Sequence, residues 1–384
     1  METAWTLLFG LAALAWLFVG VKVAVGVRKL PWLKDEVPLR DAACPKVSVL
    51  FSARDEAREL PRALAALLAL DYPNYEIVAV DDRSVDATGA ILEETARRDA
   101  RLKVIHLKEL PAGWLGKTNG LQKAYEASSG EWLVFTDADV RFAPDLLRRT
   151  TALALARGWD HLTLLGETET HGFFERVVMT YFMLGFNIYT EPWNASNPRS
   201  RKFCGIGLFQ QVRREAYEAF DGHRRLALEI VDDMKLGKLV KEGGYRSGVA
   251  IAVEMARVRW QEGFRNIVRG TTKNFFASAS FRVRTVLAQI ALIFLLSVLP
   301  VVGLFVTSGW TRLLAALACA LPILMQATGV WVARLSPLYG LSHALGASIF
   351  AYMIVRSTVV TLRRGGVDWR GTFYPLRDLR KGLA

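Results

Sequence analysis

The sequence predicts an α/β domain with a mostly parallel sheet, placed between apolar helical segments long enough to span a membrane. Two observations lead to this fold class. From Lys46 onward, β-branched runs alternate with amphipathic helical segments, a pattern typical of a doubly wound sheet. Long apolar runs lie toward both ends of the 384-residue chain, and hydrophobic residues reach 52% against 22% charged. We therefore expect a membrane-anchored protein with a water-facing middle.

The apolar ends resolve into predicted spans. The run 5–27 has about the 20 residues that a bilayer core requires, and Lys22 lies late enough in it to reach the interface with its long stem. No clear small-residue cleavage site follows this run, so we expect a retained anchor rather than a signal peptide. At the other end, 286–308 and 313–333 predict two further spans, and 338–362 predicts a span or a re-entrant segment.

These features divide the chain into five predicted parts. They are an N-terminal anchor (1–30), a soluble domain (40–262), an interfacial amphipathic segment (263–285), a C-terminal membrane region (286–362) and a basic tail (363–384). Lys and Arg flank the soluble domain on both sides, which predicts an integral protein of the inner or plasma membrane with that domain in the cytoplasm. A basic tail after three C-terminal spans would lie outside. Either 338–362 is therefore re-entrant or interfacial, or the rule fails at this end.

The net charge indicates the kind of partner that the protein binds, and the cysteines indicate its redox compartment. The net charge is +12, from 49 Lys and Arg against 37 Asp and Glu. Many of the basic residues lie beside the predicted spans, so anionic lipid headgroups explain them more simply than nucleic acid does. Cys44, Cys204 and Cys319 are scattered without metal-ligand spacing, which indicates a reducing compartment and no disulfide framework.

The soluble domain contains four clear strand predictions. The predicted strands are 46–53, 75–82, 102–109 and 131–138. Between them, helices are predicted in 55–71 and 120–128, and a turn followed by a helix is predicted in 83–99. Because strands that alternate with helices pair in parallel, their carboxyl ends lie at one edge of the sheet. Ligands of such folds bind at this edge.

Acidic residues follow three of these strands, represented by Glu56, by Asp81 and Asp82, and by Asp137 and Asp139. Any one such group is most simply a solvated loop, but three groups at one edge indicate a binding crevice. The sequence has no G-x-G-x-x-G after the first strand and no phosphate-binding G-x-x-x-x-G-K-[ST], so dinucleotide and P-loop sites lose support. The D-x-D spacing can instead hold Mg²⁺ or Mn²⁺ together with substrate phosphates. Asp139 would be the direct ligand, and Asp137 would contact ribose or the metal.

Several ordered motifs resemble the family 2 glycosyltransferases of the GT-A fold, over roughly 45–275. The matching segments are 52–88 for the nucleotide-binding half, 136–140 for the D-x-D motif, and 204–220 with 228–246 for the acceptor side and its E-D motif. Asp55 stands where Asn is common, and Asp232 stands in place of Glu. The segment 111–124, taken with the membrane helices, resembles the branch that contains hopanoid- and carotenoid-associated glycosyltransferases and, more distantly, ceramide glucosyltransferases.

The resemblance implies a donor site for a nucleotide-diphosphate sugar. Asp82, with Asp81, would hold the nucleobase or ribose, and Glu56 would lie near the ribose. Asp137 and Asp139 would hold the metal and the diphosphate. Repulsion between these two carboxylates is what a divalent cation would relieve.

The resemblance also implies residues for transfer. Asp233 would be the general base that deprotonates the acceptor hydroxyl, although acids that open a helix are often structural. Asp232 would lie on the acceptor side. Lys117 would bind the diphosphate or remain a surface lysine, and Trp114 would lie on the acceptor side or pack its loop.

One motif departs from the family pattern. Arg259 and Trp260 match the end of a motif whose members line the acceptor and diphosphate side, but Ala256 stands where Gln or Arg is common. This departure disfavours a processive polysaccharide synthase and favours single transfer to a lipid.

The combined prediction is a metal-dependent, inverting membrane glycosyltransferase that moves a sugar to a lipid hydroxyl. Two alternatives stay open. One has the same chemistry with a polyprenyl phosphate or a polysaccharide as acceptor. The other is a catalytically inactive, nucleotide-binding membrane scaffold.

Overall fold

The computed structural model describes residues 2–332 and 334–384. It divides the chain into two compact units, each formed from separate stretches of sequence. The helical unit contains the chain up to Lys29, Thr170–Glu191 and Gln261–Trp369, and the sheet unit contains Leu30–Glu169, Pro192–Trp260 and Arg370–Ala384. The first residue of the predicted anchor and the last residue of the predicted span 313–333 lie outside the described residues.

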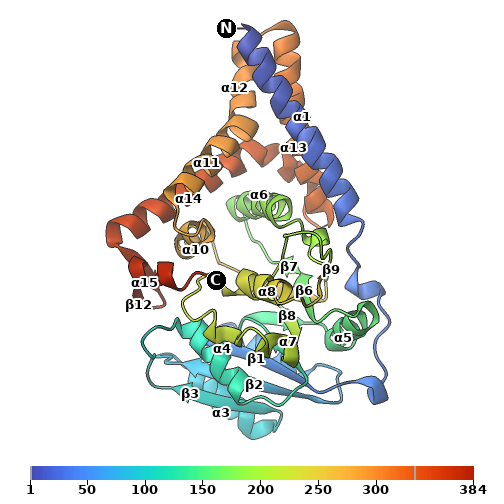
Figure 1. Cartoon of the computed structure of the whole chain (residues 1–384), viewed down its shortest axis with the longest axis vertical. Helices are drawn as coiled ribbons and strands as arrows, with labels where there is room; N and C mark the ends of the chain where they lie inside the picture. Colours follow the sequence, from blue (N-terminus) through green and yellow to red (C-terminus); the bar gives the residue numbers. More distant parts are fainter. Residues whose placement is uncertain (1, 333) are drawn as a thin grey trace. The chain divides into compact units, whose positions relative to one another are not determined.

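The sheet unit is built on a seven-stranded sheet in the order β3-β2-β1-β4-β8-β6-β9 (Figure 1). Its strands are β1 Val47–Ala53, β2 Tyr75–Asp82, β3 Leu102–Leu107, β4 Trp132–Phe135, β6 His161–Leu165, β8 Gln210–Arg213 and β9 Ser247–Ile251. Neighbouring strands pair in parallel except at β8, which is antiparallel to both β4 and β6. The predicted α/β fold with a mostly parallel sheet is confirmed.

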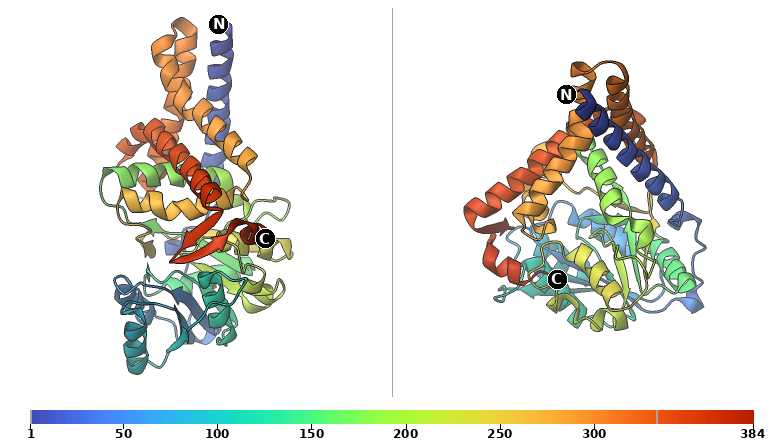
Figure 2. Two further views of the ribbon diagram at one scale, coloured as in Figure 1. Left: turned by 90° about the vertical axis from the view of Figure 1, so that its left-hand side faces the viewer. Right: turned by 45° about the horizontal axis from the view of Figure 1, so that its top comes forward.

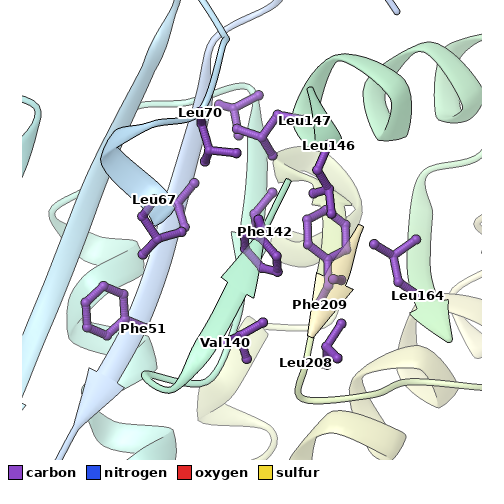
Figure 3. Packing of buried hydrophobic residues seen from close by; sticks show 14 of the residues in the cluster. Phe51, Leu67, Leu70, Val140, Phe142, Leu146, Leu147, Leu164, Leu208 and Phe209 are labelled. Carbon is purple, nitrogen blue, oxygen red and sulfur yellow. The ribbon is translucent and has the colours of Figure 1, made fainter. Parts of the chain in front are cut away.

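Helices cover both faces of this sheet, because successive strand residues point to opposite sides. Val49 and Phe51 of β1 lie in one core cluster with residues of α2, α3 and α5 (Figure 3), whereas Leu50 lies in a second cluster with residues of α4, α7 and α8. The helices of the unit are α2 Leu60–Leu68, α3 Thr88–Arg98, α4 Gly116–Glu126, α5 Leu146–Arg157, α7 Arg214–Glu218, α8 Asp232–Glu242 and α15 Leu376–Lys381. Burial on both faces explains why the strands are almost continuously apolar.

A second, three-stranded sheet has the order β5-β10-β7. Its strands are β5 Val140–Phe142, β7 Glu167–Thr168 and β10 Ala256–Val258. β5 begins directly after the D-x-D stretch, and β10 ends directly before Arg259. This small sheet therefore carries two of the predicted motifs on paired strands.

Among its described residues, the helical unit holds four helices that are long and apolar enough to cross a membrane, namely Glu2–Val27, Val283–Val306, Gly309–Val330 and Pro337–Arg364. Its elements are α1 Glu2–Val27, α6 Phe173–Thr190, α9 Phe264–Gly270, α10 Asn274–Ser278, α11 Val283–Ile293, α12 Leu299–Val306, α13 Gly309–Val332, α14 His343–Arg364 and β11 Gly366–Trp369. α1 runs beside α12 and α13 (Figure 2). Apolar side chains such as Leu11, Phe18 and Phe305 are exposed on these helices, as expected for surfaces in contact with lipid.

Two polar side chains of the helical unit, Lys22 and His343, are paired with other polar side chains. Lys22 Nζ donates to Glu191 Oε1 at 2.7 Å, so its charge is neutralised by a residue at the end of α6. His343 is hydrogen-bonded to Gln326 and Ser297, each at 3.0 Å. Such pairing satisfies polar groups that lipid would leave without partners.

The segment Arg370–Ala384 belongs to the sheet unit although more than 100 residues separate it from the preceding part of that unit. It contains β12 Thr372–Pro375 and α15, and the side chains of Leu376 and Leu379 are buried. We call it the C-terminal segment.

Candidate active site

The strand register brings the predicted acids to one edge of the large sheet. Ala53 pairs with Asp81 on the parallel strands β1 and β2, and Leu50 pairs with Phe135 on β1 and β4. The carboxyl ends of the three strands therefore meet. Because β8 is antiparallel to β4, with Gln210 opposite Phe135, the chain that leads into β8 also arrives at this edge.

The backbone of Gly207 connects the two acidic motifs. Its carbonyl accepts a hydrogen bond from the Asp137 N–H at 3.0 Å, and its N–H donates to Asp233 Oδ2 at 2.9 Å. A β-carbon at Gly207 would lie 2.7 Å from Asp137 Oδ2, and one at Gly205 would lie 1.9 Å from the Asp233 carbonyl oxygen. Gly205 therefore leaves no room for a side chain beside the Asp233 backbone, whereas a β-carbon at Gly207 would displace the Asp137 carboxylate.

Lys117 lies among three carboxylates. Its Nζ is 2.9 Å from Asp137 Oδ1 and 3.6 Å from Asp232 Oδ2. α4 begins at Gly116, four residues before the predicted helix 120–128, and this places Lys117 in its first turn. Burial acts to lower the pKa of Lys117, but Asp137, Asp232 and Asp233 outweigh it and hold the pKa above its ordinary value. The Lys117 ammonium is thus charged and interacts with these three acids.

Asp139 and Glu56 form the part of the edge with excess negative charge. Burial, together with the charges of Asp137 and Glu56, raises the pKa of Asp139 to about 7. Burial and Asp137 also raise the pKa of Glu56, against the opposing effect of Arg370. Carboxylates that repel one another in a crevice fit a divalent cation. Among the described residues no group of three or more potential ligands gathers, and a Mg²⁺-type site of one or two carboxylates completed by substrate phosphates needs no such group.

Asp81 and Asp82 are buried at the end of β2, and both carboxylates accept hydrogen bonds from neighbouring groups. Asp81 Oδ2 lies 2.9 Å from His106 Nδ1, and Asp81 Oδ1 accepts from the Ser84 N–H at 3.2 Å. The Arg83 guanidinium donates to both oxygens of Asp82, at 2.7 and 3.1 Å. Sequence reasoning missed His106 and Arg83. His106 pairs in register with Asp81 across β2 and β3, so correct pairing of two predicted strands would have found it.

The loop after β1 is fastened to the loop after β2. The Glu56 N–H donates to Thr88 Oγ1 at 2.8 Å, and Asp55 Oδ1 accepts from the Val85 N–H at 2.8 Å. Asp86 accepts from the Ala57 N–H at 3.0 Å through Oδ2. These bonds set the position of Glu56 relative to the end of β2.

Other predicted site residues lie elsewhere. Trp114 lines a pocket of about 460 Å³ together with Leu228 and Tyr374, of which Tyr374 comes from the C-terminal segment. Arg259 and Trp260 directly follow β10. The structure thus brings Lys117 together with the D-x-D and Asp232-Asp233 motifs. Trp114 instead lies in the pocket that is also lined by Tyr374 of the C-terminal segment.

Comparison with known proteins places this site in a family. Residues 48–161, which include Glu56, Asp82, Lys117 and Asp139, match the model named Glycosyl transferase family 2. The chain carries a family 2 glycosyltransferase domain. A mannosyltransferase from Pyrobaculum calidifontis, solved in complex with GDP-Man and Mn²⁺, has the same fold with a TM-score of 0.54 at 18% identity, covering 94% of this chain and 98% of that one. The fold of the glycosyltransferase domain is therefore GT-A.

Curated relatives of this chain have names that refer to lipid-related acceptors. The beta-monoglucosyldiacylglycerol synthase of Synechocystis sp. is 27% identical over 273 residues, which cover 65% of this chain and 55% of that enzyme. The 4,4'-diaponeurosporenoate glycosyltransferase of Staphylococcus aureus is 21% identical over 347 residues, covering 86% and 88%. The aligned part of this chain spans about half the length of the Synechocystis relative.

Proposed function

We propose that this protein is an inverting, metal-dependent, membrane-anchored glycosyltransferase that moves a sugar from a nucleotide-diphosphate donor to a lipid hydroxyl. One observation carries the proposal. Gly207 hydrogen-bonds both Asp137 and Asp233, so a donor-phosphate residue and a candidate base are fixed side by side. The names of the two relatives, which contain diacylglycerol and diaponeurosporenoate, support a lipid acceptor.

The donor would bind along the carboxyl edge of the sheet. Asp81 and Asp82 would hold the nucleobase or ribose, with Glu56 near the ribose. Lys117 and Asp137 would face the diphosphate. Arg83 and His106 are positioning residues, because they hold the carboxylates of Asp82 and Asp81 in fixed orientations.

Asp139 and Asp137 would hold Mg²⁺ or Mn²⁺. When bound, the cation supplies Lewis-acid stabilisation of the negative charge on the departing nucleoside diphosphate. The Mn²⁺ and GDP-Man of the Pyrobaculum calidifontis mannosyltransferase support a divalent cation and a nucleotide-sugar donor.

Transfer would proceed by a single displacement. The acceptor hydroxyl oxygen forms a bond to the anomeric carbon, the bond from that carbon to the donor phosphate oxygen breaks, and the hydroxyl proton passes to Asp233. Attack from the face opposite the leaving group inverts the anomeric configuration. The Asp233 carboxylate is half-buried and is oriented by N–H donors from Gly207 at 2.9 Å and Met234 at 2.8 Å. Asp232 would act by holding Lys117.

The acceptor would reach this site from the membrane. Arg259 and Trp260 end the sheet unit, and the chain continues directly into the helical unit. Within the helical unit, α9 is predicted to lie at the interface, and its Ile267 and Val268 pack with Val178 of α6 and Met353 of α14. We propose that these helices contact the lipid acceptor.

The C-terminal segment belongs to the sheet unit, and this bears on how many times the chain crosses the membrane. Residues up to Trp260 and from Arg370 onward belong to the same unit, so we propose that they lie on one side of the membrane and that the chain between them crosses it an even number of times. Three candidate spans lie in this interval. Pro337–Arg364 has the lowest mean hydropathy of the three and the largest buried share, so we propose that it does not cross. This arrangement places the basic tail beside the domain in the cytoplasm.

The function is tested by incubating purified protein with lipid extract, Mn²⁺ or Mg²⁺, and several radiolabelled nucleotide sugars. We expect label in a lipid product with inverted anomeric configuration. Asp139→Ala should abolish transfer in a protein that still inserts and folds. Label that appears only as free sugar, or normal turnover in excess chelator, would contradict lipid transfer and the metal requirement respectively.

A further inference from the structure

The C-terminal segment is attached to the donor edge of the sheet at separate points. Arg370 Nη2 donates to Glu56 Oε1. Arg54 Nη1 donates to Thr372 Oγ1 at 3.5 Å, and the Tyr374 hydroxyl accepts from the Gly116 N–H at 3.3 Å. Each of these attachments falls beside a predicted donor residue. They connect the segment to the loop after β1 and to the start of α4.

The anchor of the segment is mainly apolar and lies beyond Arg370. The Tyr374 side chain is only 7% exposed, Leu376 is 8% exposed and Leu379 is fully buried. Further along, the Ala384 N–H donates to the buried Glu229 Oε2 at 3.1 Å. Burial of these apolar side chains holds the segment on the domain whether or not Arg370 is paired.

Arg370 is much more exposed than the apolar side chains that anchor the segment. Its side chain is 47% exposed, whereas that of its partner Glu56 is 22% exposed. A guanidinium has five N–H donors, so pairing with one carboxylate leaves donors for a second anion. Its backbone φ is +50° and is followed by Gly371 at +75°. This conformation is unusual for a non-glycine residue, and the turn directs Arg370 toward Glu56.

The negative charge at the carboxyl edge of the sheet affects how a diphosphate can bind there. Five acids lie along this edge, namely Glu56, Asp137, Asp139, Asp232 and Asp233, although among the described residues no three of them converge as ligands on one point. The ammonium of Lys117 is shared among Asp137, Asp232 and Asp233. A diphosphate adds further negative charge beside Glu56 and Asp137, so a cation from the protein would favour its binding in addition to the divalent metal. Arg370 is in position to supply it.

We propose that Arg370 is a donor-binding residue, and that the C-terminal segment brings it to the phosphates of the nucleotide-diphosphate sugar from the far end of the chain. Arg370 bridges Glu56 and the donor phosphates when the donor binds. Planar guanidinium groups suit this role because they bind carboxylate and phosphate oxygens in parallel pairs. The inference rests on the proposed function and adds a residue that lies outside the matched region 48–161.

The test measures nucleotide binding to the full-length protein in detergent, with Mn²⁺ present and without an acceptor. The probes are UDP, UMP, GDP and GMP. The variants are Arg370→Ala, Arg370→Lys and the matched control Arg377→Ala. Arg377 lies on the same segment, is 83% exposed and pairs with its neighbour Asp378.

We expect Arg370→Ala to weaken binding of the preferred nucleoside diphosphate by about tenfold or more, as for loss of a hydrogen bond between charged groups. The matching monophosphate should change much less, Arg370→Lys should recover part of the affinity, and Arg377→Ala should bind as the wild type does. Equal loss for mono- and diphosphate would show that Arg370 only holds the segment in place, and would overturn the inference.

Two further outcomes separate this inference from the proposed function. Unchanged diphosphate binding by Arg370→Ala, with a wild type that binds, would overturn the role of Arg370 alone. A wild type that binds none of the four nucleotides would overturn the proposed function and this inference together.

Discussion

The Nζ atom of Lys117 lies 2.9 Å from Oδ1 of Asp137, so an ammonium from the first turn of α4 neutralises the first acid of the D-x-D stretch. The same ammonium lies 3.6 Å from Asp232 Oδ2. One cation therefore links the strand-end acids to the acids that open α8. This relationship explains how a largely buried edge of the sheet tolerates so many carboxylates.

Lys117→Met should both destabilise the protein and abolish transfer. Asp137 is 39% exposed, so we expect loss of the Lys117 ammonium to cost about 1–3 kcal/mol of unfolding free energy, between the values for exposed and buried pairs. Denaturant or thermal unfolding measures this loss. Addition of Asp232→Asn should recover part of the stability but none of the activity.

Lys123→Met is the matched control on the same helix. Lys123 is 44% exposed and pairs with Glu126 at 2.7 Å, and surface pairs of this kind contribute about 0–1 kcal/mol. A loss of stability as large as that of Lys117→Met would contradict the role assigned to burial.

Asp233→Asn should retain donor binding and lose transfer. An amide keeps the size of the side chain and can still accept the Gly207 N–H bond, but it cannot take the proton of the acceptor hydroxyl. General-base catalysis contributes about 10²–10⁴-fold, and the rate of lipid glycosylation with saturating donor measures its loss. An active variant would refute the base assignment and favour a phosphate acceptor, which needs no strong base.

Gly207→Ala should impair transfer more than it impairs folding. The new β-carbon would lie 2.7 Å from Asp137 Oδ2 and displace that carboxylate. Small displacements of groups that position a substrate can cost as much as about 10²-fold in rate. Gly185→Ala is the control, because a β-carbon at that helical position meets no atom within 4 Å. Comparable loss of activity in both variants would contradict the proposed connection through Gly207.

His106 should make stability depend on pH. Hydrogen bonds to Glu93 and Asp81 raise the pKa of His106 above its ordinary value. Its stabilising contribution is therefore present below the unfolded pKa of about 6.5 and is lost as the pH rises through the folded pKa. We expect the difference in Tm between the wild type and His106→Asn to be larger at about pH 5.5 than at about pH 8.5. Glu93→Gln should reduce this pH dependence, and a difference that does not change with pH would exclude the charged pair.

The proposed topology predicts the labelling of single cysteines in a variant whose three native cysteines are replaced. Ser308 lies between α12 and α13, and Ser336 lies between α13 and α14. Membrane-impermeant maleimide should label Ser308→Cys from the side opposite the sheet unit, and Ser336→Cys and Arg377→Cys from the side of that unit. Labelling of positions 336 and 377 from opposite sides would show that Pro337–Arg364 crosses the membrane.

Local patterns were sufficient for much of the fold. The strands β1 to β4 lie within three residues of their predicted ends, since β-branched apolar runs are determined by burial on both faces of a parallel sheet. The predicted helix 120–128 was wrong at its start, because Gly116 and Lys117 favour a turn locally and are drawn into α4 by contacts with Asp82 and Asp137. That tertiary effect converted a candidate surface lysine into a half-buried one beside Asp137 and Asp232.

By itself, the sequence determined the apolar ends, the parallel sheet and the order of acids at its carboxyl edge, because periodicity and burial act over a few neighbouring residues. Only the tertiary structure decided which partners those acids have. Lys117 reaches Asp137 and Asp232, Gly207 joins Asp137 to Asp233, and Arg370 reaches Glu56 from 314 positions away. Such contacts depend on the antiparallel insertion of β8 and on the return of the C-terminal segment, and no local pattern encodes either one.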